Sequence, residues 1–157
     1  FRFPWNSTGI IPSLLQSSSM ADIYSKEKRS EIMSRISGKG TKPEIILRKA
    51  LFAKGFRYRV NVGNLPGKPD IVLPKYKSVI FVHGCFWHGH SGCKHAYVPK
   101  SNTEFWINKI EMNRRRDIAT EQKLIAAGWR VITVWECEIR RMKNIDFLIE
   151  RITAQLL

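Results

Sequence analysis

Apolar and polar residues change their spacing along the chain, and the changes predict where helices and strands lie. Four segments are typical of helices. The first begins after Ser25 (KEKRSEIMSRIS) and the second follows the capping-box spacing of Thr41 and Glu44 (IILRKALFAK). The third runs from Thr103 to near Gly128, and the last follows a cap at Asn144 (DFLIERITAQLL).

Four further segments predict β-strands. Residues 56–62 (FRYRVNV) alternate, which is typical of a strand with one buried face. Residues 70–73 and 129–135 are also expected to be strands, and residues 78–82 (SVIFV) form a nearly uniform apolar run that indicates a central strand covered on both faces. We therefore expect an α/β protein in which a mixed sheet carries helices on both faces.

Residues 1–19 differ in composition from the rest of the chain. They contain one charged residue, Arg2, and end in a serine run before Met20. We expect this segment to be a non-native or disordered extension, with residues 20–157 forming a single domain that starts at Met20. A signal peptide is the alternative, although the segment has neither a starting methionine nor a convincing apolar core.

The charge of the chain favours a polyanionic partner. Lysine and arginine number 27 against 13 acidic residues, which gives a net charge of +14. Such an excess predicts attraction to nucleic acid. The run NRRRD at 113–117 offers phosphate contacts through Arg114, Arg115 and Arg116, or is simply a solvated helix face. No apolar run approaches the length of a membrane-spanning helix, and three cysteines indicate reduced thiols in a cytoplasm.

One loop, VHGCFWHGHSGCKH at 82–95, holds all four histidines and two of the three cysteines. Cys85, His90 and Cys93 lie in this loop, and Cys137 lies just past the end of the last predicted strand. Zinc prefers four thiolate or imidazole ligands, so these residues predict a structural zinc site. Alternatively, the cysteines are ordinary buried thiols.

A second group of residues is suited to hydrolytic chemistry. Asp70 begins one strand and His83 ends the next, so the two are expected side by side. A carboxylate at this place can hold Mg²⁺, and His88 can accept a proton from water. Glu44 and Asp117 are further candidate carboxylates, although each also has a local role as a helix cap or an ion-pair partner.

Three aromatic residues are candidates for inserting between DNA bases. Phe86 and Trp87 lie in the histidine loop and Trp106 lies near the start of the long helix. Aromatic wedges of this kind deform a duplex by unstacking a base step. Trp129 and Trp135 are instead expected in the core, because both lie on a predicted strand.

Four motifs, LPGKPD, VIFVHGCFWHGH, TEFWINKIEMNRRRD and GWRVITVWEC, resemble the very short patch repair (Vsr) DNA mismatch endonucleases. The resemblance runs from about Met20 to Arg141. It implies a restriction-endonuclease-like fold and Mg²⁺-dependent nicking of double-stranded DNA at T:G mismatches, which arise from deaminated 5-methylcytosine. It also implies a cytoplasmic bacterial monomer, with mismatch-repair proteins as further partners.

The resemblance also implies roles for particular residues. Asp70 and the main-chain carbonyl of Val82 match the Mg²⁺ site, and His88 matches the catalytic histidine. The supporting active-site positions are His83, Glu44, Asn113 and Asp117. The structural Zn²⁺ ligands are Cys85, His90, Cys93 and Cys137, and the wedge residues are Phe86, Trp87 and Trp106. Val82 departs from the family, whose best-known members carry threonine there, and the zinc loop is one residue longer.

Two other functions fit the same residues. A homing endonuclease of related type would use the same acid and histidine groups to cleave at a particular sequence. A non-catalytic zinc-containing DNA-binding module would keep the zinc site and the aromatic wedge, and would leave Asp70 and His88 without a role.

Overall fold

The computed structural model describes residues 25–35, 38–140 and 145–157. The chain divides into two compact units, Phe1–Ile36 and Ser37–Leu157. The predictions for residues 1–19, for a start at Met20 and for a cap at Asn144 lie outside the described residues, as does the end of the first predicted helix.

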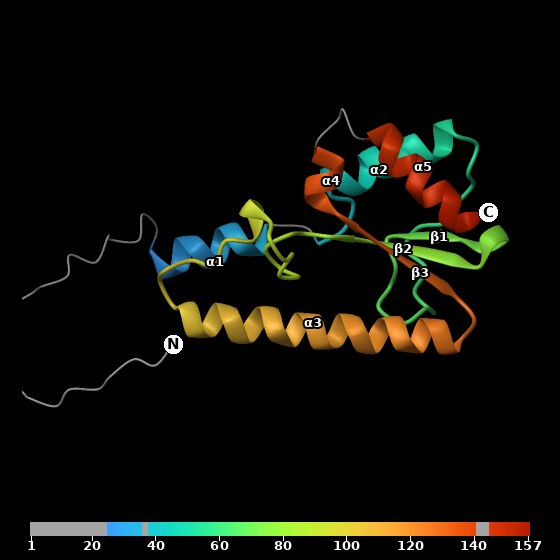
Figure 1. The fold of residues 1–157 in the computed structure, drawn as a ribbon. Helices are drawn as coiled ribbons and strands as arrows, with labels where there is room; N and C mark the ends of the chain where they lie inside the picture. Colours follow the sequence, from blue (N-terminus) through green and yellow to red (C-terminus); the bar gives the residue numbers. More distant parts are fainter. Residues whose placement is uncertain (1–24, 36–37, 141–144) are drawn as a thin grey trace, which may run out of the picture. The chain divides into compact units, whose positions relative to one another are not determined.

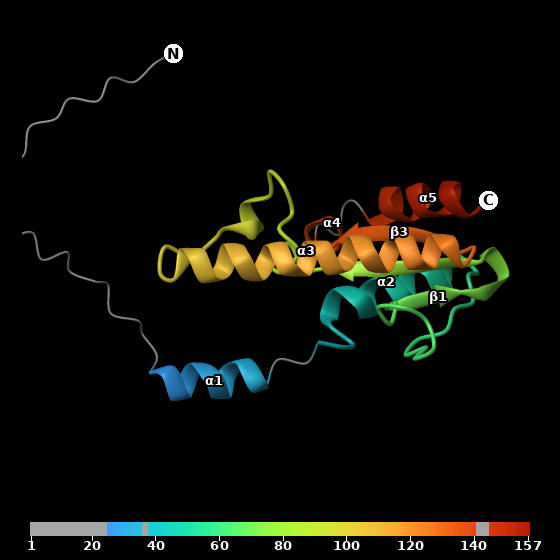
Figure 2. The ribbon, with the colours of Figure 1, turned by 90° about the horizontal axis from the view of Figure 1, so that it is seen from below.

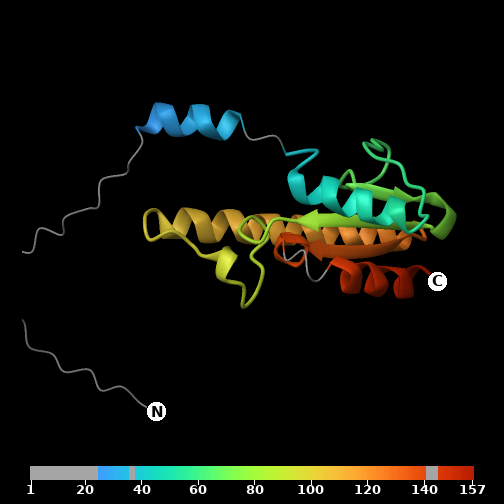
Figure 3. The same cartoon turned by 90° about the horizontal axis from the view of Figure 1, so that it is seen from above.

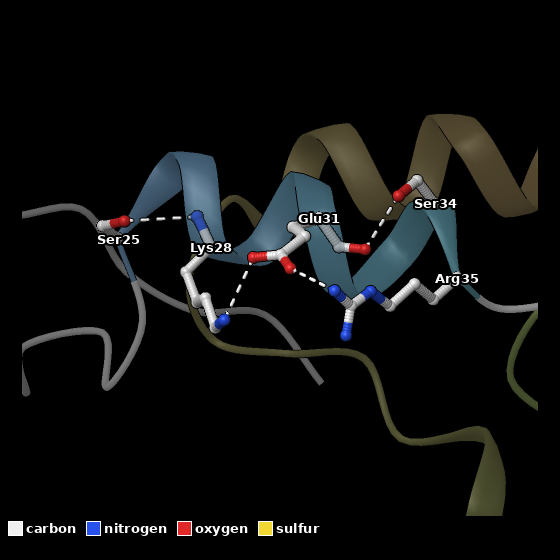
Figure 4. Close-up of polar contacts among 5 residues, drawn as sticks. All are labelled: Ser25, Lys28, Glu31, Ser34 and Arg35. Atoms are coloured by element: carbon white, nitrogen blue, oxygen red, sulfur yellow. Dashed lines mark hydrogen bonds and ion pairs between the residues drawn. The ribbon is translucent and has the colours of Figure 1, made fainter.

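The described part of the first unit is helix α1 (Lys26–Ser34), which is stabilised by its own side chains (Figure 4). The hydroxyl of Ser25 accepts a hydrogen bond from the main-chain N–H of Lys28 at 3.2 Å, which confirms Ser25 as the cap. The carboxylate of Glu31 pairs with Lys28 at 3.0 Å and with Arg35 at 2.6 Å. Exposed pairs at this spacing each stabilise a helix by a few tenths of a kcal/mol.

Within the described residues, the second unit contains a three-stranded mixed sheet in the order β1-β2-β3 (Figure 1). Strand β1 (Ile71–Leu73) pairs antiparallel with β2 (Ser78–His83) after the short 3₁₀ turn η1 (Pro74–Tyr76). Strand β3 (Arg130–Trp135) pairs parallel with β2, and His83 lies opposite Trp135 in this register. The carboxyl ends of β2 and β3 therefore meet at the same edge of the sheet.

Helices cover both faces of this sheet, as predicted. Helices α2 (Lys42–Ala53), α4 (Glu136–Arg140) and α5 (Ile145–Leu156) lie on one face (Figures 1 and 3). The long helix α3 (Thr103–Ala126) lies along the other face and extends past its end (Figures 1 and 2). No helix in the described ranges is long and apolar enough to cross a membrane.

Alternation along the strands builds two hydrophobic cores. The strand residues that face α2, α4 and α5 are Ile71, Leu73, Ile80, Ile132 and Val134. The strand residues that face α3 are Val72, Val79, Phe81 and Val131. Burial on both faces explains the uniform apolar run that the sequence shows at the start of β2.

The predicted strand at 56–62 is wrong. In the described part of the chain the sheet therefore has three strands, where four were expected. A single antiparallel bridge joins Arg59 to Val72, through N–H···O contacts of 2.8 and 2.9 Å. Phe56 is buried in the larger core and Tyr58 packs against it, so the alternation is real. Asn61 then turns the backbone with a φ of 55°, which ends the extended conformation before a ladder can form.

Candidate active site and metal centre

The three cysteines and His90 form one cluster at the carboxyl edge of the parallel strands. Cys85, His90 and Cys93 lie in the loop that follows β2, and Cys137 lies in α4, directly after β3. Their candidate ligand atoms all lie within 4.8 Å of one another. This group can hold a metal ion, as the sequence predicted.

The distances inside this cluster suit a tetrahedral zinc site. The Nδ1 atom of His90 lies 3.6 Å from Cys85 Sγ and 3.4 Å from Cys137 Sγ. Usual zinc–sulfur and zinc–nitrogen bond lengths at a tetrahedral angle separate the two ligand atoms by roughly 3.5 Å. Burial raises the pKa of the Cys85 thiol to about 12, so a cation is needed to hold it as a thiolate.

Trp135 supports this cluster, which corrects the prediction that it lies in the core. Its ring is stacked on the imidazole of His90, with centroids 4.1 Å apart and planes 2° from parallel. It also meets the ring of His83 edge-on at 5.5 Å. Trp129, the residue before β3, does pack against the smaller core, as predicted.

Asp70 lies at the edge of the sheet, immediately before β1. Its Oδ2 accepts a hydrogen bond from the main-chain N–H of Val82 at 2.7 Å. Burial raises the pKa of Asp70 to about 6, a nearby Glu44 adds to the rise, and Arg48 and His88 oppose it. The contact is with the N–H of Val82, and the carbonyl of Val82 as a metal ligand stays a prediction. A half-buried carboxylate with an oxygen beyond this bond suits a hard divalent cation such as Mg²⁺.

Glu44 approaches Asp70 from α2 and is 4% exposed. Both of its carboxylate oxygens have protein donors: Gly40 N–H at 2.9 Å and Arg48 Nη2 at 2.9 Å on Oε2, and the Thr41 hydroxyl at 2.8 Å on Oε1. The predicted capping box is therefore altered. Thr41 makes no side-chain cap, and Glu44 accepts from the main-chain N–H of Gly40 instead of that of Thr41. Glu44 is therefore buried, held by three donors, and close to Asp70, the candidate metal ligand.

His88, Asp117 and His83 form a second polar group on the α3 side of the sheet. His88 Nδ1 lies 2.5 Å from Asp117 Oδ2, and the imidazoles of His83 and His88 are stacked 3.9 Å apart at 5°. Burial, with the charge of His88, lowers the pKa of His83 to about 4, so His83 is neutral at pH 7. The Asp117 carboxylate fixes the proton of His88 on Nδ1, which leaves Nε2 free to accept another.

Asn113 ties helix α3 to the loop that carries His88, and its role as a supporting active-site residue stays a prediction. Its Nδ2 donates to the carbonyl of Trp87 at 2.9 Å, and its Oδ1 accepts from Arg116 Nη2 at 3.2 Å. The other arginines of the predicted phosphate-binding run are exposed, and Arg115 pairs with Glu111 at 3.0 Å.

The three candidate wedge residues lie together. The ring of Phe86 meets Trp87 at 5.1 Å and Trp106 at 5.4 Å, and the two indoles are 6.0 Å apart, all edge-on. Each of the three is partly exposed. Trp106 of α3 thus joins Phe86 and Trp87 of the histidine loop in one partly exposed aromatic cluster.

Two residues of this region were missed by sequence reasoning. Arg48 lies between Glu44 and Asp70, and its position at i+4 from Glu44 on a predicted helix was a usable signal. Trp135 ends a strand two residues before Cys137, but nothing in the sequence distinguishes a ring stacked on histidine from a core tryptophan.

The geometry defines a class: an α/β protein with acid and imidazole groups beside a thiol–imidazole cluster suited to a metal. Residues 21–95 match the family described as DNA mismatch endonuclease Vsr. The type II nicking enzyme V.NmeAIP of Neisseria meningitidis is 55% identical over 121 residues, which cover 77% of this chain and 86% of that protein. The DNA mismatch endonuclease Vsr of Escherichia coli is 42% identical over 135 residues, which cover 85% and 86% respectively.

The chain belongs to the Vsr family of DNA mismatch endonucleases. The resemblance expected from the sequence motifs is thereby confirmed, as is the class of enzyme, a DNA endonuclease.

Proposed function

We propose that this protein nicks one strand of double-stranded DNA at a T:G mismatch by Mg²⁺-dependent hydrolysis of a phosphodiester bond. The observation that carries the proposal is the convergence of Asp70 with the His88–Asp117 pair. Asp70 accepts a hydrogen bond from the main chain of Val82, and the next residue, His83, is stacked on His88. The names of the relatives, which include a mismatch endonuclease and nicking enzymes, support it. A restriction-endonuclease-like arrangement of the mixed sheet is part of the same proposal.

The side chains have separate tasks in this reaction. His88 takes a proton from the attacking water through Nε2, and Asp117 keeps the imidazole oriented and stabilises its charged form. His83 stays neutral and keeps the His88 ring in place by stacking. A bound Mg²⁺ would neutralise charge on the phosphate, and Asp70 is the residue that would hold it.

The remaining features support the loop and bind DNA. The thiol–imidazole cluster holds a structural Zn²⁺ that fixes the loop between β2 and α3. Phe86, Trp87 and Trp106 insert beside the mismatch, because a mispaired step opens at lower cost than a paired one. The net charge of +14 gives salt-sensitive affinity for the DNA backbone.

A nicking assay on two duplexes that differ in a single base pair tests the proposal. The zinc-loaded protein, dialysed free of Mg²⁺, is incubated with a T:G duplex and with its C:G counterpart, before and after Mg²⁺ is added. We expect Mg²⁺-dependent nicking of one strand of the T:G duplex. Equal cutting of both duplexes would indicate a sequence-specific endonuclease, and binding without cutting would indicate a non-catalytic module.

The same assay tests the residues. Asp70→Ala and His88→Ala should bind the T:G duplex and fail to nick it. If both variants nicked at the wild-type rate, the assignment of the active site would be wrong.

A further inference from the structure

Arg48 contacts both the buried Glu44 and the main chain of Asp70. Its Nη2 donates to Glu44 Oε2 at 2.9 Å and to the Asp70 carbonyl at 3.1 Å. The side chain of Arg48 is 18% exposed and that of Glu44 is 5% exposed, so the pair is largely shielded from water. One nitrogen therefore links helix α2 to the residue that enters β1.

Arg48 also lines a small pocket with the two carboxylates. The pocket has a volume of about 130 Å³ and is also lined by Lys39, Lys68, Pro69 and residues 61–63. Two acids that share such a place repel each other unless a cation lies between them. Arg48 is positioned to reduce this repulsion and to set the direction in which the Asp70 main chain turns.

We propose that Arg48 is a positioning residue of the nuclease, which holds Glu44 and the Asp70 backbone in the arrangement that binds a divalent cation. The inference rests on the proposed function, and it adds a residue that touches neither DNA nor the reacting atoms. Arg48 acts as an outer partner of a metal ligand. Loss of such partners usually weakens metal affinity or activity about 10–100-fold.

Direct binding of Mn²⁺, followed by electron paramagnetic resonance on the zinc-loaded protein, tests this role without using nicking. We expect R48Q to bind Mn²⁺ at least about tenfold more weakly than the wild type. R48K keeps the charge and a donor and should recover most of that affinity. The matched control is K49Q, which removes a positive charge from the exposed neighbouring position of the same helix.

A double variant covers the case in which R48Q leaves Glu44 as an uncompensated buried charge and does not fold. E44Q/R48Q removes both charges, which usually destabilises less than removal of one. It should still bind Mn²⁺ more weakly than E44Q alone, because the donor to the Asp70 carbonyl is also lost.

Equal Mn²⁺ affinity in R48Q and wild type, or in E44Q and E44Q/R48Q, would overturn the role of Arg48. Failure of R48K to improve on R48Q would also overturn it, because charge and hydrogen bonding are the proposed cause. A wild type that bound Mn²⁺ but nicked no duplex would contradict the proposed function alone, and the affinities would still decide the role of Arg48.

Discussion

His88 Nδ1 lies 2.5 Å from Asp117 Oδ2, and this bond joins the histidine loop to the middle of α3. An acceptor at Nδ1 determines which nitrogen of His88 carries the proton and therefore which one can act as a base.

Asp117→Asn should retain DNA binding and lower the nicking rate by about 100-fold or more. The amide has the same shape but no longer stabilises a positive charge on His88. Single-turnover nicking at saturating Mg²⁺ measures the effect, with Glu111→Gln on the exposed face of the same helix as the control. A rate equal to that of the control would show that Asp117 does not act through His88.

Asp70→Asn should make the protein more stable above pH 6 while abolishing nicking. The pKa of Asp70 is raised from 3.8 to about 6, so the fold disfavours the charged carboxylate. The stability of the wild type therefore falls as the pH rises from 3.8 to about 6, and the variant, which has no charge at this position, does not lose stability in this way. We expect a gain of about 1–3 kcal/mol in the free energy of unfolding at pH 7.5 without Mg²⁺.

Urea unfolding of the zinc-loaded proteins at pH 7.5 and pH 5 provides the measurement. The difference between wild type and Asp70→Asn should narrow toward pH 5, where Asp70 is mostly protonated. A gain that grew as the pH was lowered would contradict this assignment of sign.

Cys93→Ala should remove the zinc and lower the melting temperature. Cys93 is more exposed than the buried Cys85, so its loss opens little space in the core and mainly removes a ligand. Metal analysis should give one zinc for each wild-type chain and much less for the variant. Ser91→Ala, in the same loop and exposed, is the control and should keep its zinc.

Replacing both Phe86 and Trp87 by alanine should reduce the preference for a T:G mismatch. Base–aromatic stacking contributes about 1–3 kcal/mol for each base. The hydrogen bond from the Asn113 side chain to the main-chain carbonyl of residue 87 survives the change, so the loop keeps its support. The ratio of nicking rates on mismatched and paired duplexes is measured against Phe52→Ala, which removes an exposed aromatic from α2. An unchanged ratio would argue against the wedge.

Gly67→Ala should destabilise the loop that leads to Asp70. Gly67 has a φ of +71°, and an added Cβ would lie 2.3 Å from Thr120 Cγ2 on α3. Both the strained backbone and the overlap contribute, so we expect the free energy of unfolding to fall by about 1–3 kcal/mol. Adding Thr120→Ser removes that methyl group and should restore part of the loss. Gly63→Ala meets nothing within 4 Å and should be close to neutral.

The elements that bury a full face were predictable from sequence. The start of β2 is buried on both faces and gives a uniform apolar run, whereas α3 is buried only at Ile110, Asn113 and Leu124 and was bounded by Thr103 and Gly128. The alternation at 56–62 has a similar physical cause, because Phe56 and Tyr58 do pack inward. Alternation reports burial but not hydrogen bonding, so it could not reveal that this segment makes a single bridge.

The short helix α4 was not predicted, because its five residues are too few to show a periodicity. Its Glu138 accepts a hydrogen bond from the Trp135 N–H at 2.8 Å and forms an ion pair with the distant Arg151 at 2.9 Å. The candidate site residues were selected by chemical type and by family resemblance. Arg48 was not selected. Its i+4 spacing from Glu44 could have indicated an ion pair, but nothing in the sequence indicated its contact with the Asp70 main chain.

The placement of His88 between Cys85 and His90 along the chain affects how inhibition by chelators should be interpreted. If the thiol cluster holds zinc and His88 is the base, as proposed, a strong chelator that removes the zinc would also release the loop that carries His88. Activity would then stop even if the second ion were irrelevant. Only selective depletion, with the tighter site kept filled, can reveal which ion the cleavage step requires.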